Sequence, residues 1–455
     1  MEHQKDTISA IVTPLGQGGV GIIRLSGKES LNIALRLFKS SQKHFTSPKP
    51  YRLHHGHVYS TQGELLDEVL LAYMPEPGSY TGEDVVEINC HGGPAILQAL
   101  LEETLKLGAR LAKPGEFTYR AFLNGKLDLT QAEAVAELIS APTKKAIPLA
   151  QQKLSGLLKE KISSLRANLE EIKQHFCLAV DFPEEELEIL PPTQLSPQIK
   201  TILREIQELI TNYEQKHIYQ DGALVVLTGR VNAGKSSLLN ALIGKERALV
   251  TPIPGTTRDY LEEGINLKGL PVRLVDTAGL RETQDEVENL GLKRGWELLK
   301  QCDLCLLLID IEEDWSEFED KVLESIEQEK IILVINKIDK AETKPLWLNQ
   351  CKLEPIFLSA KTGKNLNLLT EQILKKLVGQ QKEQQSLLVP NLRQKICLQQ
   401  AQEELEKLLQ NLSQLPYDLL SLHLDVAIRK LAEITGEITT EETLEAIFSR
   451  FCIGK

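Results

Sequence analysis

Apolar residues in the first quarter of the chain gather in short runs separated by turn residues. These runs predict four strands, at 7–14, 19–27, 68–74 and 84–93. Apolar residues then recur at helical spacing over 94–109, with Gly108 near the end, so this stretch predicts a helix. Strands and a helix mixed in this order indicate an α+β domain over residues 1–120.

Helical periodicity takes over from about residue 121. It extends through 129–140 and 147–176, which contain few glycines. An acidic, proline-bearing segment at 181–197 is expected to form a loop before the next helix, 199–213. The apolar side chains of that helix fall on one face: Ile199, Ile202, Ile206, Leu209, Ile210 and Tyr213.

Strand-like apolar runs alternate with helical stretches between residues 222 and 380. The runs that predict buried strands are 223–229, 272–275, 305–310 and 331–336. Such alternation indicates a parallel sheet covered by helices on both faces.

Helical periodicity returns at 394–412 and 424–436, so helical segments flank the α/β block on both sides. We therefore predict a multidomain α/β fold in which this block is inserted into one all-α helical domain. The predicted domains are an α+β domain at 1–120, a discontinuous helical domain at 121–221 plus 381–455, and the α/β domain at 222–380.

Composition agrees with several folded domains. The 455 residues exceed what one hydrophobic core usually supports, and 42% of them are hydrophobic. Apolar stretches stay below the ~18 residues of a membrane helix, and the first residues lack the features of a signal peptide. We expect a cytoplasmic protein without membrane association. The net charge of −12 argues against a dedicated duplex-DNA binder, although a local basic patch could still contact RNA.

Seven cysteines, odd in number and scattered, do not form a disulfide framework and fit a reducing compartment. One closely spaced pair, Cys302 and Cys305, could be a redox or metal pair. Both begin an apolar run that predicts a buried strand, so we favour packing as small hydrophobic side chains.

A phosphate-binding motif follows the first strand of the α/β block. Residues 229–237, GRVNAGKSS, match G-x-x-x-x-G-K-[ST] and precede a helical stretch. Glycines let backbone N–H groups point at one anion, and the helix N-terminus adds its dipole. Lys235 is expected to neutralise the β and γ phosphates, and the Ser236 hydroxyl to bind Mg²⁺.

Three further motifs follow apolar strands in the order expected of a GTP-binding domain. Asp276 in DTAG (276–279) is expected to hold Mg²⁺ through water, and the Gly279 N–H to meet the γ-phosphate. In NKID (336–339), Asp339 can accept from two guanine N–H donors that adenine lacks in this arrangement. The last motif, SAK (359–361), supplies a backbone contact to the guanine carbonyl.

The residue after DTAG departs from many signalling GTPases. These carry a glutamine there that orients the attacking water, whereas this chain has Leu280. Either hydrolysis is poor or the domain orients water differently. The threonine-containing stretch 250–259 and the acidic run 281–288 favour the second alternative.

Taken together, these segments resemble the MnmE (TrmE) family of tRNA-modification GTPases. The likeness runs from IVTPLGQGGVGIIRLSG (11–27) to the terminal FCIGK (451–455). Between them lie PGSYTGEDVVEINCHGGP, KPGEFTYRAFLNGKLDL, GRVNAGKSSLLN, PGTTRD and DTAGLRETQDEVE. The resemblance implies an N-terminal folate-binding domain, a discontinuous helical domain and an inserted GTPase domain.

The resemblance also implies potassium-activated hydrolysis when two GTPase domains meet. K⁺ ligands are then Asn232, through its side chain, and the carbonyls of Thr251, Ile253 and Thr256, while Thr257 joins Ser236 on Mg²⁺. Glu288 then orients the attacking water; without the resemblance we favour a solvated acid on a helix face, since Asp285 and Glu286 are equally plausible. The catalytic set is Glu288, Lys235 and Cys452. The expected GTP-binding set is Asn232, Ala233, Gly234, Lys235, Ser236, Ser237, Thr251, Pro252, Ile253, Pro254, Gly255, Thr256, Thr257, Asp276, Thr277, Ala278, Gly279, Asn336, Lys337, Asp339, Ser359, Ala360 and Lys361.

By the same resemblance, a 5-formyl- or methylene-tetrahydrofolate supplies a one-carbon unit and contacts Arg24, Glu87, Lys126 and Lys455. A homodimer acts with the FAD-dependent partner MnmG (GidA), as a heterotetramer, to add an aminomethyl-type group at C5 of the wobble uridine of tRNA. A carboxylate suits the amino and N–H groups of a pterin ring, and basic residues suit the glutamate tail.

Ordinary structural alternatives remain at this second site. Arg24 and Lys126 could be surface charges, and Glu87 could face solvent. Cys452 is either a thiol near the folate or a small packed side chain. His91, beside Gly92 and Gly93, is better explained by a packed turn than by binding.

Two other functions compete with tRNA modification. A ribosome-assembly GTPase shares the nucleotide motifs and often the leucine after DTAG, but it would carry a basic RNA-binding appendage that this chain lacks. A non-catalytic GTP switch would need no folate chemistry. Folate binding by the N-terminal region distinguishes among the three.

Overall fold

The computed structural model describes residues 6–14, 16–181, 192–245, 262–276, 295–341, 345–351, 353–378 and 388–455. They belong to two compact units. Unit 1 draws on Met1–Ala136, Lys153–Leu190 and Gln410–Lys455, and unit 2 on Glu137–Gln152 and Pro191–Leu409. Within the described ranges, every helix is too short or too polar to cross a membrane.

A mixed seven-stranded sheet forms the N-terminal part of unit 1. Its strands are β1 (Ile8–Ile11), β2 (Gly18–Ser26), β3 (Phe38–Ser40), β4 (Leu53–Tyr59), β5 (Leu65–Met74), β6 (Val85–Gly92) and β7 (Arg110–Leu111). They lie in the order β3-β4-β5-β6-β2-β1-β7, antiparallel apart from the β1–β7 pair. The four predicted strands correspond to β1, β2, β5 and β6 and are confirmed.

Helices cover both faces of this sheet. Helices α1 (Ser30–Leu37) and α2 (Pro94–Lys106) pack on one face, where Leu97 and Leu100 are buried with the strands. The predicted helix at 94–109 is thereby confirmed as α2. On the other face, Phe117 of α3 (Glu116–Leu123) packs against Ile8 and Ala10 of β1.

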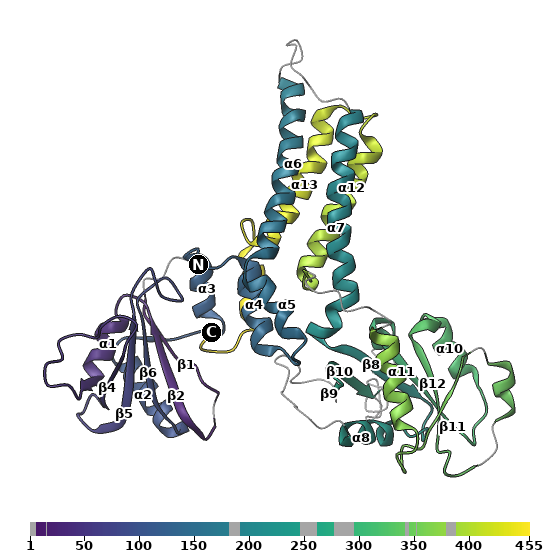
Figure 1. Ribbon diagram of the computed structural model, residues 1–455, viewed down its shortest axis with the longest axis horizontal. Coiled ribbons are helices and arrows are strands. Elements are labelled where there is room, and N and C mark those ends of the chain that lie inside the picture. The colour runs from purple at the N-terminus through teal and green to yellow at the C-terminus, as the bar shows by residue number, and fades with distance from the viewer. Residues whose placement is uncertain are drawn as a thin grey trace, which may run out of the picture. The chain divides into compact units, whose positions relative to one another are not determined.

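The remaining helices of unit 1 come from both flanks of the α/β block. They are α4 (Leu129–Ser140), whose residues from Glu137 on belong to unit 2, α6 (Leu157–Asp181), α13 (Tyr417–Thr435) and α14 (Glu441–Phe448). Helix α6 lies beside α13 (Figure 1), where Lys173 pairs with Asp425 at 2.5 Å and Phe176 stacks on Tyr417. Two segments far apart in sequence therefore share one hydrophobic interface.

A second pair of flanking helices belongs to unit 2. Helix α7 (Pro192–Asp221) lies beside α12 (Leu392–Asn411), with Gln402 donating to Gln207 at 2.9 Å (Figure 1). The six apolar residues predicted to share one face of α7 are all buried, as predicted. The expected loop at 181–197 is wrong in its last part, because α7 already begins at Pro192 and includes Pro197. A proline is tolerated at the first helical position, which Pro192 occupies, because the N–H there has no intrahelical acceptor, whereas Pro197 lies inside the helix. Helix α5 (Ala146–Leu154) is separate from α6, and Gly156, a poor helix former, lies at the break.

The α/β block is a six-stranded sheet in the order β13-β12-β11-β8-β10-β9. Its strands are β8 (Ala223–Gly229), β9 (Glu262–Leu267), β10 (Leu270–Asp276), β11 (Leu304–Asp310), β12 (Ile331–Asn336) and β13 (Ile356–Phe357). Every pair is parallel except β9–β10, so the predicted parallel sheet is confirmed with one antiparallel edge strand. The short 3-10 helices are Gln328–Lys330 and Leu346–Gln350.

Helices cover both faces of this sheet, as predicted. Helices α8 (Lys235–Lys245) and α11 (Leu366–Val378) bury one face, to which Val225 and Leu227 point. Helix α10 (Glu317–Ser325) covers the other, through Val322 against Val226. Because successive strand residues point to opposite faces, the continuous apolar run of β8 is explained.

Candidate functional site

The sequence motifs of the α/β block meet at one edge of its sheet. Strands β8, β10 and β12 are parallel, and their carboxyl ends carry Gly229, Asp276 and Asn336. After β8 the chain places β10 on one side of it and β11 on the other, so the strand order reverses there. Ligands of open α/β sheets bind outside the carboxyl ends of the strands at such a reversal.

The loop between β8 and α8 has the backbone conformation of a phosphate cradle. Asn232 and Gly234 take positive φ angles, 65° and 94°. A Cβ atom at Gly234 would collide with the Asn336 side chain, so only glycine fits. Helix α8 begins directly after it, at Lys235. A left-handed bend followed by a helix N-terminus directs N–H groups and a dipole toward one anion.

Two side chains at the start of α8 occupy the positions that phosphate and Mg²⁺ binding require. The Lys235 side chain is buried, and its Nζ donates to the carbonyls of Gly229 at 2.7 Å and Arg230 at 2.8 Å. The Ser236 hydroxyl donates to Asp276 Oδ2 at 2.8 Å. A hydroxyl beside a buried carboxylate is a hard oxygen pair of the kind that Mg²⁺ prefers.

Asn336 joins the phosphate loop to the loop after β13. Its Nδ2 donates to the Ala233 carbonyl at 2.9 Å, while its Oδ1 accepts from the Ala360 N–H at 3.0 Å. The residue is 1% exposed. Because the amide is fully engaged within the protein, it positions two binding segments.

Asp339 and Ser359 form the end of the site where a guanine is expected. The Ser359 hydroxyl donates to Asp339 Oδ1 at 2.5 Å, and this bond lowers the pKa of the carboxyl. An ionised carboxylate has only acceptors, which matches two neighbouring guanine N–H donors. Lys337, at φ 65°, turns its ammonium to Asp310 Oδ2 at 2.6 Å.

Sequence reasoning missed two supports of this site. Asp310 ends β11 and binds Lys337, and its position at the end of an apolar run was a usable signal. Arg230 contacts Glu313 at 3.3 Å and the fully buried Glu319 at 3.2 Å, which ties the phosphate loop to α10. Arg230 stands at one of the unspecified positions of the phosphate-binding motif, so its residue type gave no such signal.

Many expected nucleotide-site residues lie outside the described residues. These are Thr251, Pro252, Ile253, Pro254, Gly255, Thr256, Thr257, Thr277, Ala278, Gly279, Leu280 and Glu288. Of the expected K⁺ ligands, the structure describes Asn232. Described members that have not been placed above are Ser237 in α8 and Lys361, which is exposed beside Ala360.

All four expected folate residues belong to unit 1, and three of them, Arg24, Glu87 and Lys455, lie close together. Arg24 of β2 faces Glu87 of β6 in the register, and Nε donates to Glu87 Oε1 at 2.8 Å. The two side chains are only 15% and 21% exposed, so neither is an ordinary surface charge. Burial, followed by the charge of Arg24, lowers the pKa of Lys455, and Glu87 acts in the opposite direction.

The C-terminal residues are fixed against this pair. Arg24 Nη1 donates to the Gly454 carbonyl, and the Phe117 N–H donates to the Lys455 carbonyl, both at 3.2 Å. Gly454 has φ 94°, and a Cβ there would lie 2.6 Å from the Ile11 carbonyl oxygen. Cys452 is exposed. The chain terminus is thus part of the arrangement that contains Arg24 and Glu87.

Lys126 and His91 make other contacts. Lys126 Nζ donates to the Pro77 carbonyl at 2.9 Å, in the loop that precedes β6. His91 Nδ1 lies 2.7 Å from Asp67 Oδ1, and this hydrogen bond raises the pKa of the imidazole. The histidine side chain is 67% exposed, so the pair is a surface contact.

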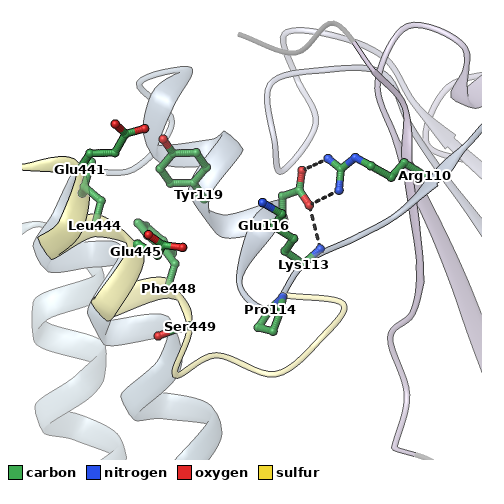
Figure 2. Close-up of a pocket in the computed structure, with 10 residues that line it drawn as sticks. All are labelled: Arg110, Lys113, Pro114, Glu116, Tyr119, Glu441, Leu444, Glu445, Phe448 and Ser449. Carbon is green, nitrogen blue, oxygen red and sulfur yellow. Dashed lines mark hydrogen bonds and ion pairs between the residues drawn. The ribbon is translucent and has the colours of Figure 1, made fainter. Parts of the chain in front are cut away.

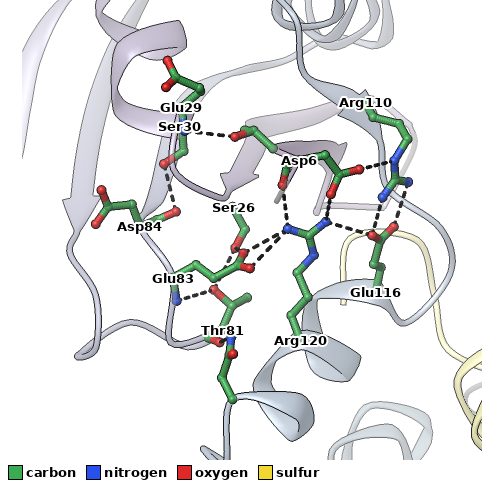
Figure 3. A network of polar contacts seen from close by, with 12 residues as sticks. Asp6, Ser26, Glu29, Ser30, Thr81, Glu83, Asp84, Arg110, Glu116 and Arg120 are labelled. Carbon is green, nitrogen blue, oxygen red and sulfur yellow. Dashed lines mark hydrogen bonds and ion pairs between the residues drawn. The ribbon is translucent and has the colours of Figure 1, made fainter. Parts of the chain in front are cut away.

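An ionic network holds the first turn of α3 in place (Figure 3). Arg120 contacts Asp6 at 2.7 Å, and Glu83 and Glu116 at 3.1 Å each. Arg110 of β7 contacts the same Asp6 and Glu116. Because α3 begins at Glu116, the network fixes the turn whose Phe117 N–H holds the C-terminus.

A separate cavity of about 200 Å³ lies between α3 and α14 (Figure 2). Tyr119 and Phe448 meet edge-to-face, with ring centroids 5.2 Å apart. The lining consists of Arg110, Lys113, Pro114, Glu116, Tyr119, Glu441, Leu444, Glu445, Phe448 and Ser449. The expected folate residues do not line it.

The paired cysteines are packing residues, as we favoured. Burial raises the pKa of the Cys302 thiol to about 11 and raises that of Cys305 well above its ordinary value. Among the residues that the structure describes, no group of three or more His, Cys, Asp or Glu side chains could hold a metal ion. Buried, protonated thiols are inert.

The sheet order, the glycine-bearing loop and the Asp339 end define a P-loop GTPase. Family models agree. The model described as "GTP-binding protein TrmE N-terminus" matches residues 7–126, and "MnmE helical domain" matches residues 129–452. The chain belongs to the MnmE family of tRNA modification GTPases. It is accordingly a GTP hydrolase of that family.

Relatives named "tRNA modification GTPase MnmE" match over their full length. Those of Nitratidesulfovibrio vulgaris (strain Hildenborough), Lawsonia intracellularis and Aquifex aeolicus are 46%, 45% and 44% identical. The matches cover 100%, 99% and 99% of this chain and 100% of each relative. Among solved structures, the G domain of the T. maritima FeoB iron transporter is 27% identical over 34% of this chain and 98% of that chain, with a TM-score of 0.26. At this TM-score the likeness does not support a fold assignment, and the fold is assigned from the strand order and the family.

Proposed function

We propose that this chain couples potassium-activated GTP hydrolysis to modification of the wobble uridine of certain tRNAs. With the flavin-dependent partner MnmG (GidA), it adds a carboxymethylaminomethyl or aminomethyl group at C5, using a tetrahydrofolate one-carbon donor. The observation that carries the proposal is that described residues of all four nucleotide motifs, represented in DTAG by Asp276, lie at one sheet edge in a chain whose whole length matches the family.

Lys235, Ser236 and Asp276 are proposed to bind the phosphates and Mg²⁺. Lys235 Nζ donates hydrogen bonds to two carbonyls of the phosphate loop, so its positive charge is held next to that loop. Ser236 and Asp276 share a hydrogen bond at the start of α8, and Thr257 is proposed to join Ser236 as a ligand. A bound Mg²⁺ supplies positive charge where the phosphate oxygens gather.

Asn232, Thr251, Ile253 and Thr256 are proposed to hold K⁺ when two GTPase domains meet. The support in the described residues is Asn232, whose φ of 65° lies in the bend of the phosphate loop. A monovalent cation there provides the charge that an arginine finger provides elsewhere. Glu288 is proposed to orient the attacking water, because Leu280 has no polar group to do so.

The folate site is proposed at Arg24, Glu87 and Lys455, with Lys126 at its edge. Glu87 Oε1 already accepts from Arg24 Nε at 2.8 Å and lies 2.7 Å from Nη2, and the amino and N–H edge of a pterin can take the place of this guanidinium. Lys455 adds a cation for the glutamate tail. Cys452, exposed next to this cluster in sequence, is proposed to take part in the modification chemistry.

The predicted domain boundaries also remain part of the proposal: 1–120, 121–221 with 381–455, and 222–380. The N-terminal domain is proposed to mediate a homodimer, which joins MnmG as a heterotetramer in the cytoplasm. This division assigns folate chemistry and GTP turnover to different domains. GTP hydrolysis is therefore proposed to drive a conformational cycle, while the modification chemistry takes place elsewhere.

The proposal is tested in a bacterial host that lacks its own MnmE. Nucleoside mass spectrometry of tRNA should detect the modified wobble uridine when this chain is expressed. Lys235→Ala should abolish both GTP hydrolysis and the modification. Normal hydrolysis by the wild-type chain with an unmodified uridine would contradict the tRNA assignment.

A further inference from the structure

A hollow of about 340 Å³ lies in unit 2, away from the nucleotide motifs. Its lining consists of Lys145, Tyr219, Lys268, Leu270, Leu374, Lys375 and Val378. Three of these residues are lysines and none is acidic, although the whole chain carries a net charge of −12. A local concentration of cations on an acidic protein indicates an anionic ligand.

The hollow lies at the end of the sheet opposite the phosphate loop. Strands β8 and β10 are parallel, with Val272 facing Ala223 and Asp276 facing Leu227. Their carboxyl ends carry the nucleotide motifs, so Leu270, at the other end of β10, marks the remote edge. The last turn of α7 with Tyr219, which leads into β8, lies there as well (Figure 1). The lysines therefore cannot serve the phosphates of GTP.

Each lysine comes from a different element, and the floor between them is apolar and aromatic. Lys145 precedes α5, Lys268 is in the β9–β10 turn, and Lys375 is in the last turn of α11. Lys145 Nζ lies 5.5 Å from the Tyr219 ring centroid. Leu270, Leu374 and Val378 complete the floor. Cations around an aromatic surface are the combination that binds phosphates and bases of nucleic acids.

Lys268 adopts a backbone conformation that lysine disfavours. Its φ of 48° is left-handed, where asparagine, aspartate or glycine is usual in a two-residue hairpin turn. Among the residues that the structure describes, Glu371 is the acidic side chain in contact with Lys268, at 3.9 Å, and both side chains are 62% exposed. Such an exposed pair stabilises little. Lys268 therefore occupies a strained backbone position where other residue types fit better, and this indicates a role for its charged side chain.

Ordinary explanations cover the lysines only one at a time. Lys375 suits the negative end of the α11 dipole, and a lysine beside the edge strand β9 discourages edge pairing. Neither explains why both, with Lys145, surround one aromatic-floored hollow. Nor does either explain a lysine at a left-handed position.

We propose that this hollow binds a backbone phosphate of tRNA through Lys145, Lys268 and Lys375, with Tyr219 beneath the adjoining sugar or base. The inference rests on the proposed function, since it assigns a contact surface to that RNA. An acidic polypeptide is the alternative anion, but an aromatic floor between cations favours a nucleic acid.

The test uses the full chain and an unmodified tRNA transcript, with binding followed by fluorescence anisotropy from roughly 50 to 300 mM KCl. The triple variant Lys145→Gln, Lys268→Gln, Lys375→Gln should reduce the steepness of log affinity against log salt by about 0.7–0.9, because one lost phosphate contact removes that much. Lys321→Gln, on the exposed side of α10, is the matched control and should retain the wild-type slope.

Further measurements keep a folding defect apart from a lost contact. GTP hydrolysis without tRNA should be unchanged in the triple variant, and the three lysine-to-arginine exchanges should restore the slope. Lys268→Asn should be at least as resistant to heat as the wild type, because asparagine tolerates this φ, yet bind tRNA more weakly.

Three results would overturn the inference. One is an unchanged slope in a triple variant that still binds tRNA, which leaves the proposed function intact. Another is a triple variant that no longer binds a poly-glutamate peptide bound by the wild type but still binds tRNA like the wild type. That result would assign the hollow to an acidic protein. The third is absence of tRNA binding by the wild type; if the host tRNA also stays unmodified, the proposed function fails with it.

Discussion

The side-chain amide of Asn336 donates a hydrogen bond to the Ala233 carbonyl, at 2.9 Å, and so ties the guanine end of the nucleotide site to its phosphate loop. Its oxygen accepts from Ala360 at the same time. One buried side chain therefore joins three motifs, of which the phosphate loop is 103 residues and the Ala360 motif 24 residues away in sequence.

Asn336→Ala should weaken GTP and GDP binding alike. The change leaves the Ala233 carbonyl and the Ala360 N–H without this partner in a buried position, at a cost of about 1–3 kcal/mol each. We expect the Kd of both nucleotides to rise about tenfold or more in calorimetric titrations. Asn240→Ala, exposed on α8, is the control. Loss of GTP binding with normal GDP binding would instead indicate a contact to the γ-phosphate.

Asp339→Asn should change base preference. The carboxylate offers acceptors to two guanine N–H donors, whereas the amide presents a donor to one of them. We expect GTP affinity to fall about a hundredfold and xanthosine triphosphate, which has a carbonyl at that ring position, to bind better than it does to the wild type. Ser359→Ala removes the hydroxyl that orients Asp339 and should lower GTP affinity without this gain. Equal GTP affinity in Asp339→Asn would exclude the base contact.

The sequence patterns predicted the structure correctly where one physical effect dominates. The continuous apolar runs of β8 and β11 predicted buried parallel strands because both faces are covered. The position of Asp276 and Asn336 at strand ends predicted that they would share one sheet edge. Cys302 and Cys305 were correctly interpreted as core residues because they stand at the start of the apolar run that forms β11.

Other features depend on partners that no local pattern names. The turn of α3 is set by Arg120 and its carboxylate partners Asp6, before β1, and Glu83, before β6, and the helix spans the predicted boundary at residue 120. Helix α7 begins at Pro192 because packing of its apolar face outweighs the local proline signal. The burial of Arg24 and Glu87 follows from strand register and from the chain terminus that covers them.

The network around α3 should make unit 1 sensitive to acid. Burial opposes ionisation of Asp6 and Glu116, but hydrogen bonds from Arg110 and Arg120 outweigh it, so both pKa values are lowered in the folded state. A lowered folded pKa stabilises the protein above the ordinary carboxyl pKa of about 4, and this contribution is lost as pH falls through the folded value. The protection of the α3 amides against exchange, relative to the intrinsic rate at each pH, should therefore fall below about pH 4.

Arg120→Met tests that origin of the acid response. It leaves three carboxylates without their shared guanidinium, so α3 should open more readily at pH 7, by about 2 kcal/mol after allowance for partial exposure of the carboxylates. The further loss below about pH 4 should then be smaller than in the wild type. Arg36→Met, exposed on α1, should behave like the wild type. An undiminished acid response in Arg120→Met would show that other groups carry it.

Potassium should raise steady-state GTP hydrolysis at least about tenfold over sodium, because a cation held between phosphates replaces a missing arginine finger. Asn232→Ala should remove most of this difference and leave the rate in NaCl unchanged relative to the wild type in NaCl. The measurement is phosphate release at equal ionic strength in the two salts. Equal rates for the wild type in KCl and NaCl would rule out the potassium assignment.

Removal of Gly454 and Lys455 should weaken binding of a tetrahydrofolate. Arg24 would lose the Gly454 carbonyl that helps to aim its guanidinium, and Phe117 would lose the Lys455 carbonyl that fastens the terminus to α3. We expect a rise in Kd of about tenfold by calorimetry, which corresponds to one lost charged hydrogen bond. Lys455→Met keeps the backbone contacts, so a smaller effect would separate the side chain from the carbonyls. Arg450→Ala, exposed just before the terminal segment, is the control, and unchanged affinity in the truncated chain would argue against a terminal folate contact.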